Sequence, residues 1–166
     1  ICAVTPPHWE SQMATPKPKT ILTVHLEGAC PTHSRTEVAG RDIKSIIDEP
    51  LERDGSNLGH TPVETLLGAL IGCTNVIGHK VAKMHGVDIT ALAIDVEAQF
   101  DRRGVTLAEE IDIPFPSLKL FIDLTTTSDE ASVDKLKQDL QRFCPVSKVI
   151  RQSGTEIEEI WTVSHP

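Results

Sequence analysis

The sequence predicts an α+β fold in which antiparallel sheets surround one long helix that carries a cysteine. Apolar residues recur at helical spacing from residue 62 to residue 86, and Cys73 lies in the middle of this stretch. Strands and helices follow one another in groups instead of alternating regularly, which favours α+β over α/β. Alternating apolar and polar residues predict strands at 20–28, 34–39, 43–48, 89–100, 117–126 and 156–163.

The first part of the chain divides into an arm and a sheet. Residues 1–19 contain four prolines, and we interpret them as an irregular N-terminal arm, followed by a single domain over residues 20–166. The first three strands follow one another closely and predict an antiparallel meander. Residues 49–60 are polar and glycine-containing, so they predict a loop that leads into the long helix.

The long helix has sequence signals at its beginning and along one face. Pro62 suits the first helical turn, where its missing N–H costs nothing. Gly68 and Gly72 are four residues apart, so they share a face on which another backbone can approach closely. Because glycine costs about 1 kcal/mol in a helix interior, this pair indicates a packing or functional reason. We expect the helix to end near Gly86.

The second half predicts two strands, two helices and a last strand. Residues 101–112 are expected to form a loop between the two strands. Ser128 is a good N-cap for the next helix, which should run to about Phe143. Pro145 fits the first position of a short second helix ending near Ser153. One apolar stripe of the longer helix contains Val133, Leu136, Leu140 and Phe143.

Composition excludes several classes of function. The net charge of −8 and pI of about 5.3 argue against nucleic-acid binding. We expect no apolar run to reach the roughly 18 residues of a membrane span. We also expect no secretory signal and a cytoplasmic location. Aromatic residues make up 4% of the chain, so a stacked cofactor has few partners and none is expected. Cys30 and His33 have C-x-x-H spacing, but no second pair is nearby and no metal site is expected.

The cysteines are the candidate reactive groups. Cys73 alone is most simply a small core residue, since free cysteine is among the most buried types. Cys144 stands at or near the N-cap of the short helix, where the helix dipole favours a thiolate. The two together are a plausible attacking and resolving pair, although spacing alone does not place them in contact.

Two segments resemble the cysteine motifs of the OsmC/Ohr superfamily, the osmotically inducible and organic hydroperoxide resistance proteins. The first is Thr-Pro-Val-Glu-Thr-Leu-Leu-Gly-Ala at 61–69, followed by Gly-Cys-Thr at 72–74. The second is Phe-Cys-Pro-Val-Ser at 143–147, followed by Val-Ile at 149–150. The order of the expected elements agrees as well, and the resemblance covers residues 20–163.

The resemblance implies an OsmC-like fold, an intertwined homodimer with active sites at its interface, and a thiol-dependent peroxidase that reduces organic hydroperoxides to alcohols. It assigns Cys73 as the peroxidatic thiol and Cys144 as the resolving thiol, which form a disulfide. It also assigns Arg53 and Glu64, which would hold Cys73 as a thiolate. An external dithiol, in this family a lipoyl-bearing protein, would reduce the disulfide.

Other interpretations remain open from the sequence. Arg35 and Arg41 are alternatives to Arg53, which by itself reads as a solvated loop charge. Glu64 by itself reads as a carboxylate near the positive end of the helix dipole. Many family members carry a carboxylate directly after the proline, and here that position is Val63. The alternative function is therefore a non-catalytic dimer that binds a small apolar or electrophilic ligand; a structural disulfide between the two cysteines is a third reading.

Overall fold

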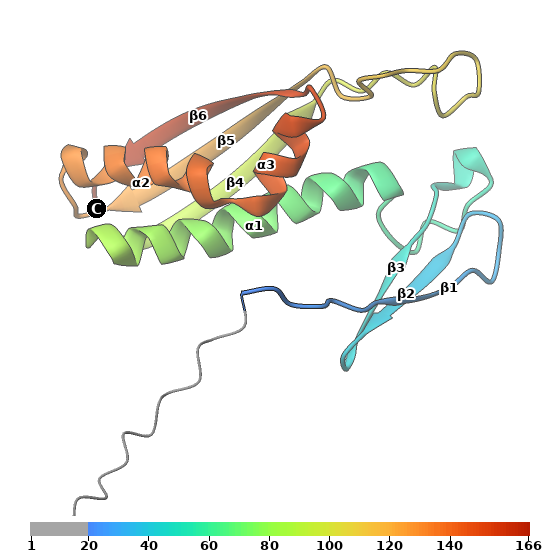
Figure 1. The fold of residues 1–166 in the computed structure, drawn as a ribbon, viewed down its shortest axis with the longest axis horizontal. Coiled ribbons are helices and arrows are strands. Elements are labelled where there is room, and N and C mark those ends of the chain that lie inside the picture. The colour runs from blue at the N-terminus through green and yellow to red at the C-terminus, as the bar shows by residue number, and fades with distance from the viewer. Residues whose placement is uncertain (1–19) are drawn as a thin grey trace, which may run out of the picture.

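The computed structural model describes residues 20–166, which form two three-stranded sheets and three α-helices (Figure 1). The α+β class and the long central cysteine-bearing helix are confirmed. The expected N-terminal arm lies outside the described residues. The elements are β1 (Glu27–Ala29), β2 (Thr36–Gly40), β3 (Ile43–Ile47), the 3-10 turn η1 (Leu51–Arg53), α1 (Pro62–His85), β4 (Ile89–Ala98), β5 (Ser117–Thr126), α2 (Glu130–Phe143), α3 (Pro145–Gln152) and β6 (Glu156–Ser164).

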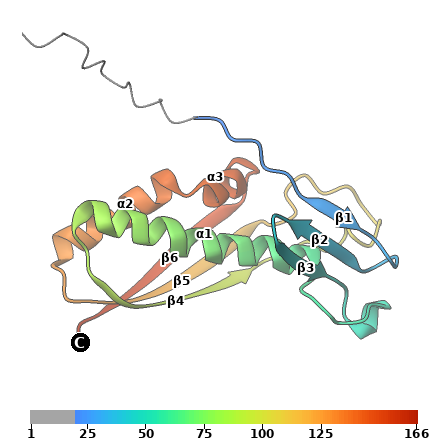
Figure 2. The same ribbon diagram turned by 90° about the horizontal axis from the view of Figure 1, so that it is seen from below.

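The larger sheet is covered on one face by all three α-helices (Figures 1 and 2). Its strand order is β4-β5-β6, with β4 and β5 antiparallel. The pair β5 and β6 is parallel, which differs from the antiparallel pattern expected of most of the fold. A parallel pair needs a long crossover, and the two helices α2 and α3 between the strands supply it.

The alternating patterns predict the faces of the larger sheet correctly. In β5 the residues at alternate positions from Leu118 to Leu124 are at most 2% exposed, while Lys119 and Asp123 face outward. The inward residues pack against Leu70 of α1 and against α2, so the core lies between the sheet and the helices. The core is largely aliphatic.

The smaller sheet, β1 to β3, lies beyond the N-terminal end of α1 in both views (Figures 1 and 2). Its register pairs Thr36 with Ile47 and Glu27 with Ala39, as an antiparallel meander. The first strand is shorter than expected, because only Glu27–Ala29 pairs with β2. The apolar residues along the predicted strand are exposed: Ile21, Leu22, Val24 and Leu26 are 63–86% exposed.

The helix α1 begins and ends as predicted. Pro62 occupies the first helical position, and Gly86 ends the helix in the left-handed region with φ 69°. Within residues 20–166, α1 has the length and composition of a membrane span, contrary to the expectation that no run is long enough. It contacts α2, α3 and β4, so its place in the protein core accounts for part of its apolar character.

The helix α2 ends at Phe143 as predicted, but its start and the exposure of its last residue differ from expectation. Asp129 is the N-cap, and its side chain accepts a hydrogen bond from the Ser132 N–H. Ser128 instead accepts from the Asp88 N–H with its hydroxyl, at 2.8 Å, and so ties the start of α2 to the end of α1. Phe143 is 52% exposed although it continues the apolar stripe, because the chain turns into α3 at this point.

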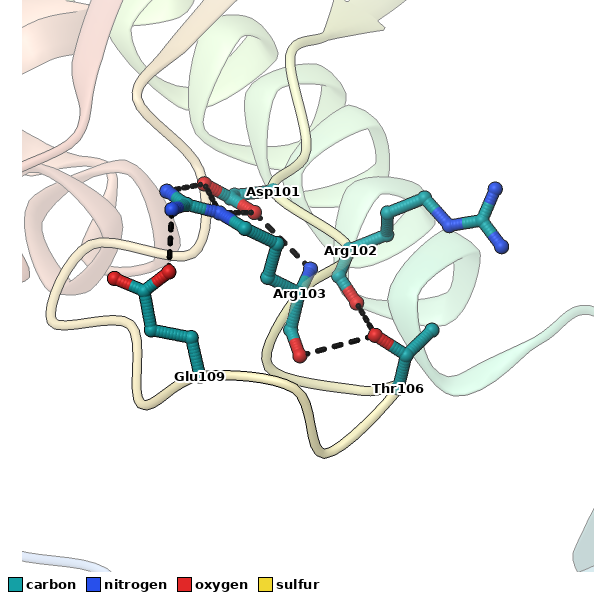
Figure 3. Close-up of polar contacts among 5 residues, drawn as sticks. All are labelled: Asp101, Arg102, Arg103, Thr106 and Glu109. Atoms are coloured by element: carbon teal, nitrogen blue, oxygen red, sulfur yellow. Dashed lines mark hydrogen bonds and ion pairs between the residues drawn. The ribbon is translucent and has the colours of Figure 1, made fainter.

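The segment between β4 and β5 is a loop, as expected, but its polar residues are organised around one guanidinium (Figure 3). Arg103 makes a two-pronged contact with Asp101 and bonds Glu109 with its remaining nitrogen, at 2.6 Å. The hydrogen bonds from Arg103 lower the pKa of Asp101. Thr106 closes the turn by donating to the Arg102 and Arg103 carbonyls, while the Arg102 side chain points away (Figure 3).

Candidate functional site

The two motif cysteines are brought together by the packing of α3 on α1. Cys73 lies midway along α1, and Cys144 is both the C-cap of α2 and the N-cap of α3. Their sulfurs are 3.2 Å apart, with Cys144 donating to Cys73. A disulfide bond is about 2.05 Å long, so the pair is a juxtaposed dithiol. Their separation of 71 positions along the chain explains why no local pattern could show this contact.

The environments of the two thiols differ. Cys144 is 1% exposed, whereas Cys73 is only partly buried. The pKa of Cys144 is raised to about 11, mainly by burial and in smaller part by the neighbouring Cys73, while the N–H groups of Ser147 and Val146 act to lower it. Desolvation therefore outweighs the start of α3, where the helix dipole was expected to favour a thiolate. At neutral pH Cys144 is a protonated thiol.

The walls around the sulfur pair are apolar. Cys144 belongs to the main core cluster with Leu70, and Cys73 packs against the same cluster. Val146 and Ile150 of α3 also belong to this group. The pair thus sits where the core reaches the surface of the chain, and an apolar molecule that approaches Cys73 meets aliphatic side chains.

Arg53 lies in η1, inside a tightly built loop. Its Nε donates to Glu49 Oε2 at 2.5 Å, and the Arg53 side chain is 61% exposed. Asp48, fully buried, holds the loop by accepting from the Ser56 hydroxyl and from three backbone N–H groups. The hydrogen bond from Ser56 and those from the backbone lower the pKa of Asp48 to about 2. A Cβ at Gly55 would lie 1.8 Å from the Glu49 carbonyl oxygen, so this turn requires glycine.

Glu64 has a structural role at the start of α1. Thr61 accepts from the Glu64 N–H, and Glu64 accepts from the Thr61 N–H at 2.8 Å, which is a capping box. This backbone hydrogen bond is the main reason that the pKa of Glu64 is lowered; His60 and Arg53 add to it. Nine residues separate Glu64 from Cys73, roughly 14 Å along the helix at about 1.5 Å per residue. Glu64 therefore does not lie against the sulfurs within the chain, and the Arg53 side chain bonds Glu49 and neither sulfur.

The two alternative arginines lie in the smaller sheet. Arg35 precedes β2 and pairs with Glu37 at 3.3 Å. Its Nε is buried and has no hydrogen-bond partner among the described residues. Arg41 is exposed at the β2–β3 turn, with φ 56°. Within residues 20–166, the sulfurs of Cys73 and Cys144 make their polar side-chain contact with each other and with no arginine.

A buried polar group beneath α3 was missed by the sequence analysis. Arg151 of α3 bonds Glu159 of β6 at 3.2 Å, and the Glu159 side chain is 5% exposed. The signal was present, because Glu159 occupies an inward position of β6 between Ile157 and Trp161. A carboxylate on the apolar face of a strand requires a buried partner.

The described residues 20–166 contain no group of three or more His, Cys, Asp or Glu that could hold a metal ion. Cys30 is exposed, and its sulfur lies 3.7 Å from the Thr36 hydroxyl. His33 is exposed as well.

Comparisons with known proteins agree with this architecture. The family of OsmC-like proteins matches residues 54–159, more than half of the chain. Anti-bacteriophage protein B of Escherichia coli K12 is 30% identical over 150 residues, which cover 81% of this chain and 21% of that protein. The chain thus spans about a fifth of the length of that curated relative.

Solved structures show the same fold. An OsmC-like protein from Mycoplasma pneumoniae superposes with a TM-score of 0.73 at 15% identity, covering 87% of this chain and 99% of that one. An organic hydroperoxide resistance protein from Legionella pneumophila gives a TM-score of 0.59 at 16% identity, with 88% and 99% covered. With the family match over the segment that carries both cysteines, the chain belongs to the OsmC-like protein family.

Proposed function

We propose that this protein is a thiol-dependent peroxidase that reduces organic hydroperoxides to alcohols. The observation that carries the proposal is the sulfur pair: a partly exposed Cys73 with a buried, protonated Cys144 3.2 Å away. A thiolate that attacks and a thiol that resolves need this proximity and this difference in exposure. The Legionella structure of the same fold is named an organic hydroperoxide resistance protein, which supports the peroxide class of substrate.

The proposed cycle has three balanced steps. The Cys73 thiolate attacks the terminal oxygen of ROOH, the O–O bond breaks, and the alkoxide takes a proton to leave as ROH. Cys73 is then a sulfenic acid, and the Cys144 sulfur displaces its hydroxyl, so that a disulfide forms and water leaves with the Cys144 proton. An external dithiol, for which we propose a lipoyl group, gives two electrons and two protons and becomes a disulfide itself. No cofactor takes part.

We further propose an intertwined homodimer in which Glu64 and Arg53 act across the interface. A Cβ at Gly68 or Gly72 would meet no atom within 4 Å, so that face of α1 is open to a second backbone. If two α1 helices cross antiparallel about a point between Gly68 and Ala69, Glu64 of one copy comes level with Cys73 of the other. The exposed apolar residues of segment 20–26 would be covered at the same time. We propose that this dimer acts in the cytoplasm.

The test begins with reduced protein and counts free thiols after addition of tert-butyl hydroperoxide. Wild type is expected to lose two thiols per chain and to form a Cys73–Cys144 disulfide. Cys144→Ser should stop at a sulfenic acid that dimedone traps, and Cys73→Ser should consume no peroxide. Cys30→Ser, which changes an exposed thiol hydrogen-bonded to Thr36, is the matched control. Consumption of peroxide by Cys73→Ser at the wild-type rate would refute the proposal.

The second candidate is a dimer that binds a small apolar or electrophilic ligand without catalysis. It is favoured by one observation, namely that Glu64 is engaged in the capping box and Arg53 in its pair with Glu49. This candidate predicts slow oxidation of Cys73 that does not distinguish organic peroxides from hydrogen peroxide, and a ligand retained through purification. Native mass spectrometry of the purified protein decides it, because a mass equal to that of the bare dimer contradicts a retained ligand.

A further inference from the structure

We infer that Arg151, held by Glu159, is a positioning residue that fixes the start of α3 and thereby sets the reactivity of Cys144. Every nitrogen of its guanidinium donates to a different residue. Nε donates to the Ser147 hydroxyl at 3.3 Å, one terminal nitrogen to the Ile157 carbonyl at 2.9 Å, and the other to Glu159 Oε1 at 3.2 Å. One side chain thus joins α3 to two points of β6.

Glu159 is itself fixed on both oxygens. Oε1 accepts from Arg151, and Oε2 accepts from the Trp161 indole N–H at 3.3 Å. The carboxylate is 5% exposed, so the pair with Arg151 lies on the apolar inner face of β6. The Arg151 side chain is 34% exposed, so the ion pair is only partly buried. Such a pair brings little net stability, whereas its directional hydrogen bonds define one arrangement. The pair therefore matters more for fixing the position of α3 relative to β6 than for the stability of the fold.

Ser147 connects this pair to the sulfur. Its hydroxyl accepts a hydrogen bond from Arg151, and Ser147 is only 4% exposed. Ser147 lies in the first turn of α3, which Cys144 caps. Its backbone N–H acts to lower the Cys144 pKa, against the larger effect of burial. A shift of Ser147 would therefore move the N–H that favours negative charge on the Cys144 sulfur as its proton leaves. It also moves Cys144 away from the sulfur of Cys73.

The inference rests on the proposed dithiol cycle and concerns its second step alone. Cys73 is carried by α1, and none of its polar side-chain contacts within residues 20–166 involves Arg151. Loss of Arg151 should therefore leave the attack of Cys73 on peroxide unchanged. It should slow closure of the disulfide, because a displacement of about 1 Å in a reacting group costs up to about a hundredfold in rate.

The experiment measures the two steps separately in Arg151→Met, with Arg142→Met as the matched control. Arg142 is two residues before Cys144 and pairs with Asp139 of its own helix, but it is 71% exposed and contacts neither α3 nor β6 in its polar contacts. With tert-butyl hydroperoxide, loss of the Cys73 thiol reports the first step. Disulfide formation reports the second, and dimedone traps any sulfenic acid that waits between them.

A second oxidant separates this inference from the proposed peroxidase activity. Diamide, a diazene, joins two thiols directly: its N=N bond takes up two electrons and two protons and becomes N–H on both nitrogens, while the disulfide forms. Disulfide closure by diamide needs no peroxide chemistry. If wild type fails to react with peroxide but closes with diamide, the peroxidase proposal fails and the role of Arg151 is still measured.

We expect Arg151→Met to close the disulfide about tenfold more slowly with either oxidant and to accumulate trapped sulfenic acid, with its first step at the wild-type rate. Glu159→Gln, which keeps the shape and removes the charge, should show a smaller slowing in the same step. Glu159→Gln also tests the inference if Arg151→Met does not fold. Closure at the wild-type rate in the folded variants, or equal slowing of both steps, would overturn the inference.

Discussion

The thiol of Cys144 donates to the sulfur of Cys73 across 3.2 Å, and this contact joins the α2–α3 junction to the middle of α1. Closing it to a disulfide requires the sulfurs to approach by only about 1 Å. The donor is buried and protonated, and the acceptor is partly exposed. In the proposed cycle this difference assigns the attack to Cys73, because its sulfur is the more exposed of the two.

Cys144 is expected to ionise near pH 11 in the folded protein, since burial disfavours its thiolate. The chain contains no tyrosine, so the ultraviolet absorbance of thiolates can be followed without a phenolate signal. In a variant that keeps Cys144 as its only cysteine, the absorbance should still rise well above the ordinary value of 9.0 in the native state, because burial is the largest cause of the shift, and near 9.0 in urea. Native titration at the ordinary value would contradict the buried thiol.

The same shift has a consequence for stability. The native state holds the Cys144 proton more tightly than the unfolded chain, so this contribution is complete below about pH 9 and is lost as the pH rises towards 11. Cys144→Ala should remove that part of the alkaline loss in urea unfolding curves. Cys30→Ala, at an exposed thiol, should leave the alkaline profile of wild type unchanged.

Asp48 should make the protein sensitive to acid. Its folded pKa is about 2 against an ordinary value of 3.8, so its contribution to stability is present above pH 4 and is lost as the pH falls towards 2. Asp48→Asn is expected to be less stable than wild type at pH 7 and to show a flatter loss of stability between these pH values. Urea unfolding across that range measures both effects.

A matched variant distinguishes loop support from surface charge. Asp54 lies in the same loop and is exposed, so Asp54→Asn should unfold like wild type at every pH. An Asp48→Asn protein whose acid profile equals that of wild type would show that the hydrogen bonds from Ser56 and the backbone do not stabilise the carboxylate.

The capping box separates two possible roles of Glu64. Thr61→Ala removes the N-cap side chain and should cost about 1 kcal/mol of unfolding free energy. Glu64→Gln keeps a side chain that can accept from the Thr61 N–H, so it should cost less. If Glu64 also acts on Cys73 of a second copy, Glu64→Gln should slow the reaction with peroxide about tenfold, while Thr61→Ala should not.

Equal peroxide rates in the two variants would restrict Glu64 to capping. The measurement is the rate of Cys73 thiol loss, taken at protein concentrations where the oligomeric state of both variants has been matched by analytical ultracentrifugation.

The open face of α1 predicts a dimer that a bulky residue disrupts. Gly68 has free space around a Cβ within one protomer, so Gly68→Leu should not destabilise an isolated chain. In the proposed dimer it would separate the two α1 backbones and raise the dissociation constant at least about a hundredfold, an overpacking cost of roughly 3 kcal/mol. Sedimentation of wild type and variant across a dilution series measures the change.

Gln138→Leu on the exposed face of α2 is the control for added apolar surface. It should dissociate at the wild-type concentration. A wild-type protein that sediments as a monomer at every concentration would contradict the dimer directly.

Local patterns determined most of the secondary structure. The alternation of β4 and β5 predicted their inner faces, and the signals at Pro62 and Gly86 predicted the bounds of α1, because these features depend on neighbours a few residues away. The motifs around Cys73 and Cys144 predicted the family. The errors at Ser128 and Phe143 have a different origin. The Ser128 hydroxyl bonds the distant Asp88 N–H, and Phe143 is exposed because the chain turns into α3 there.

What only the tertiary structure decided is the chemistry around the sulfurs. The 3.2 Å contact, the protonated state of Cys144 and the pair of Arg151 with Glu159 all join residues on different elements. The helix dipole at the start of α3 is a local effect that a sequence pattern can predict. Desolvation depends on every atom packed around Cys144, so its larger effect on the pKa is fixed only once the core has formed.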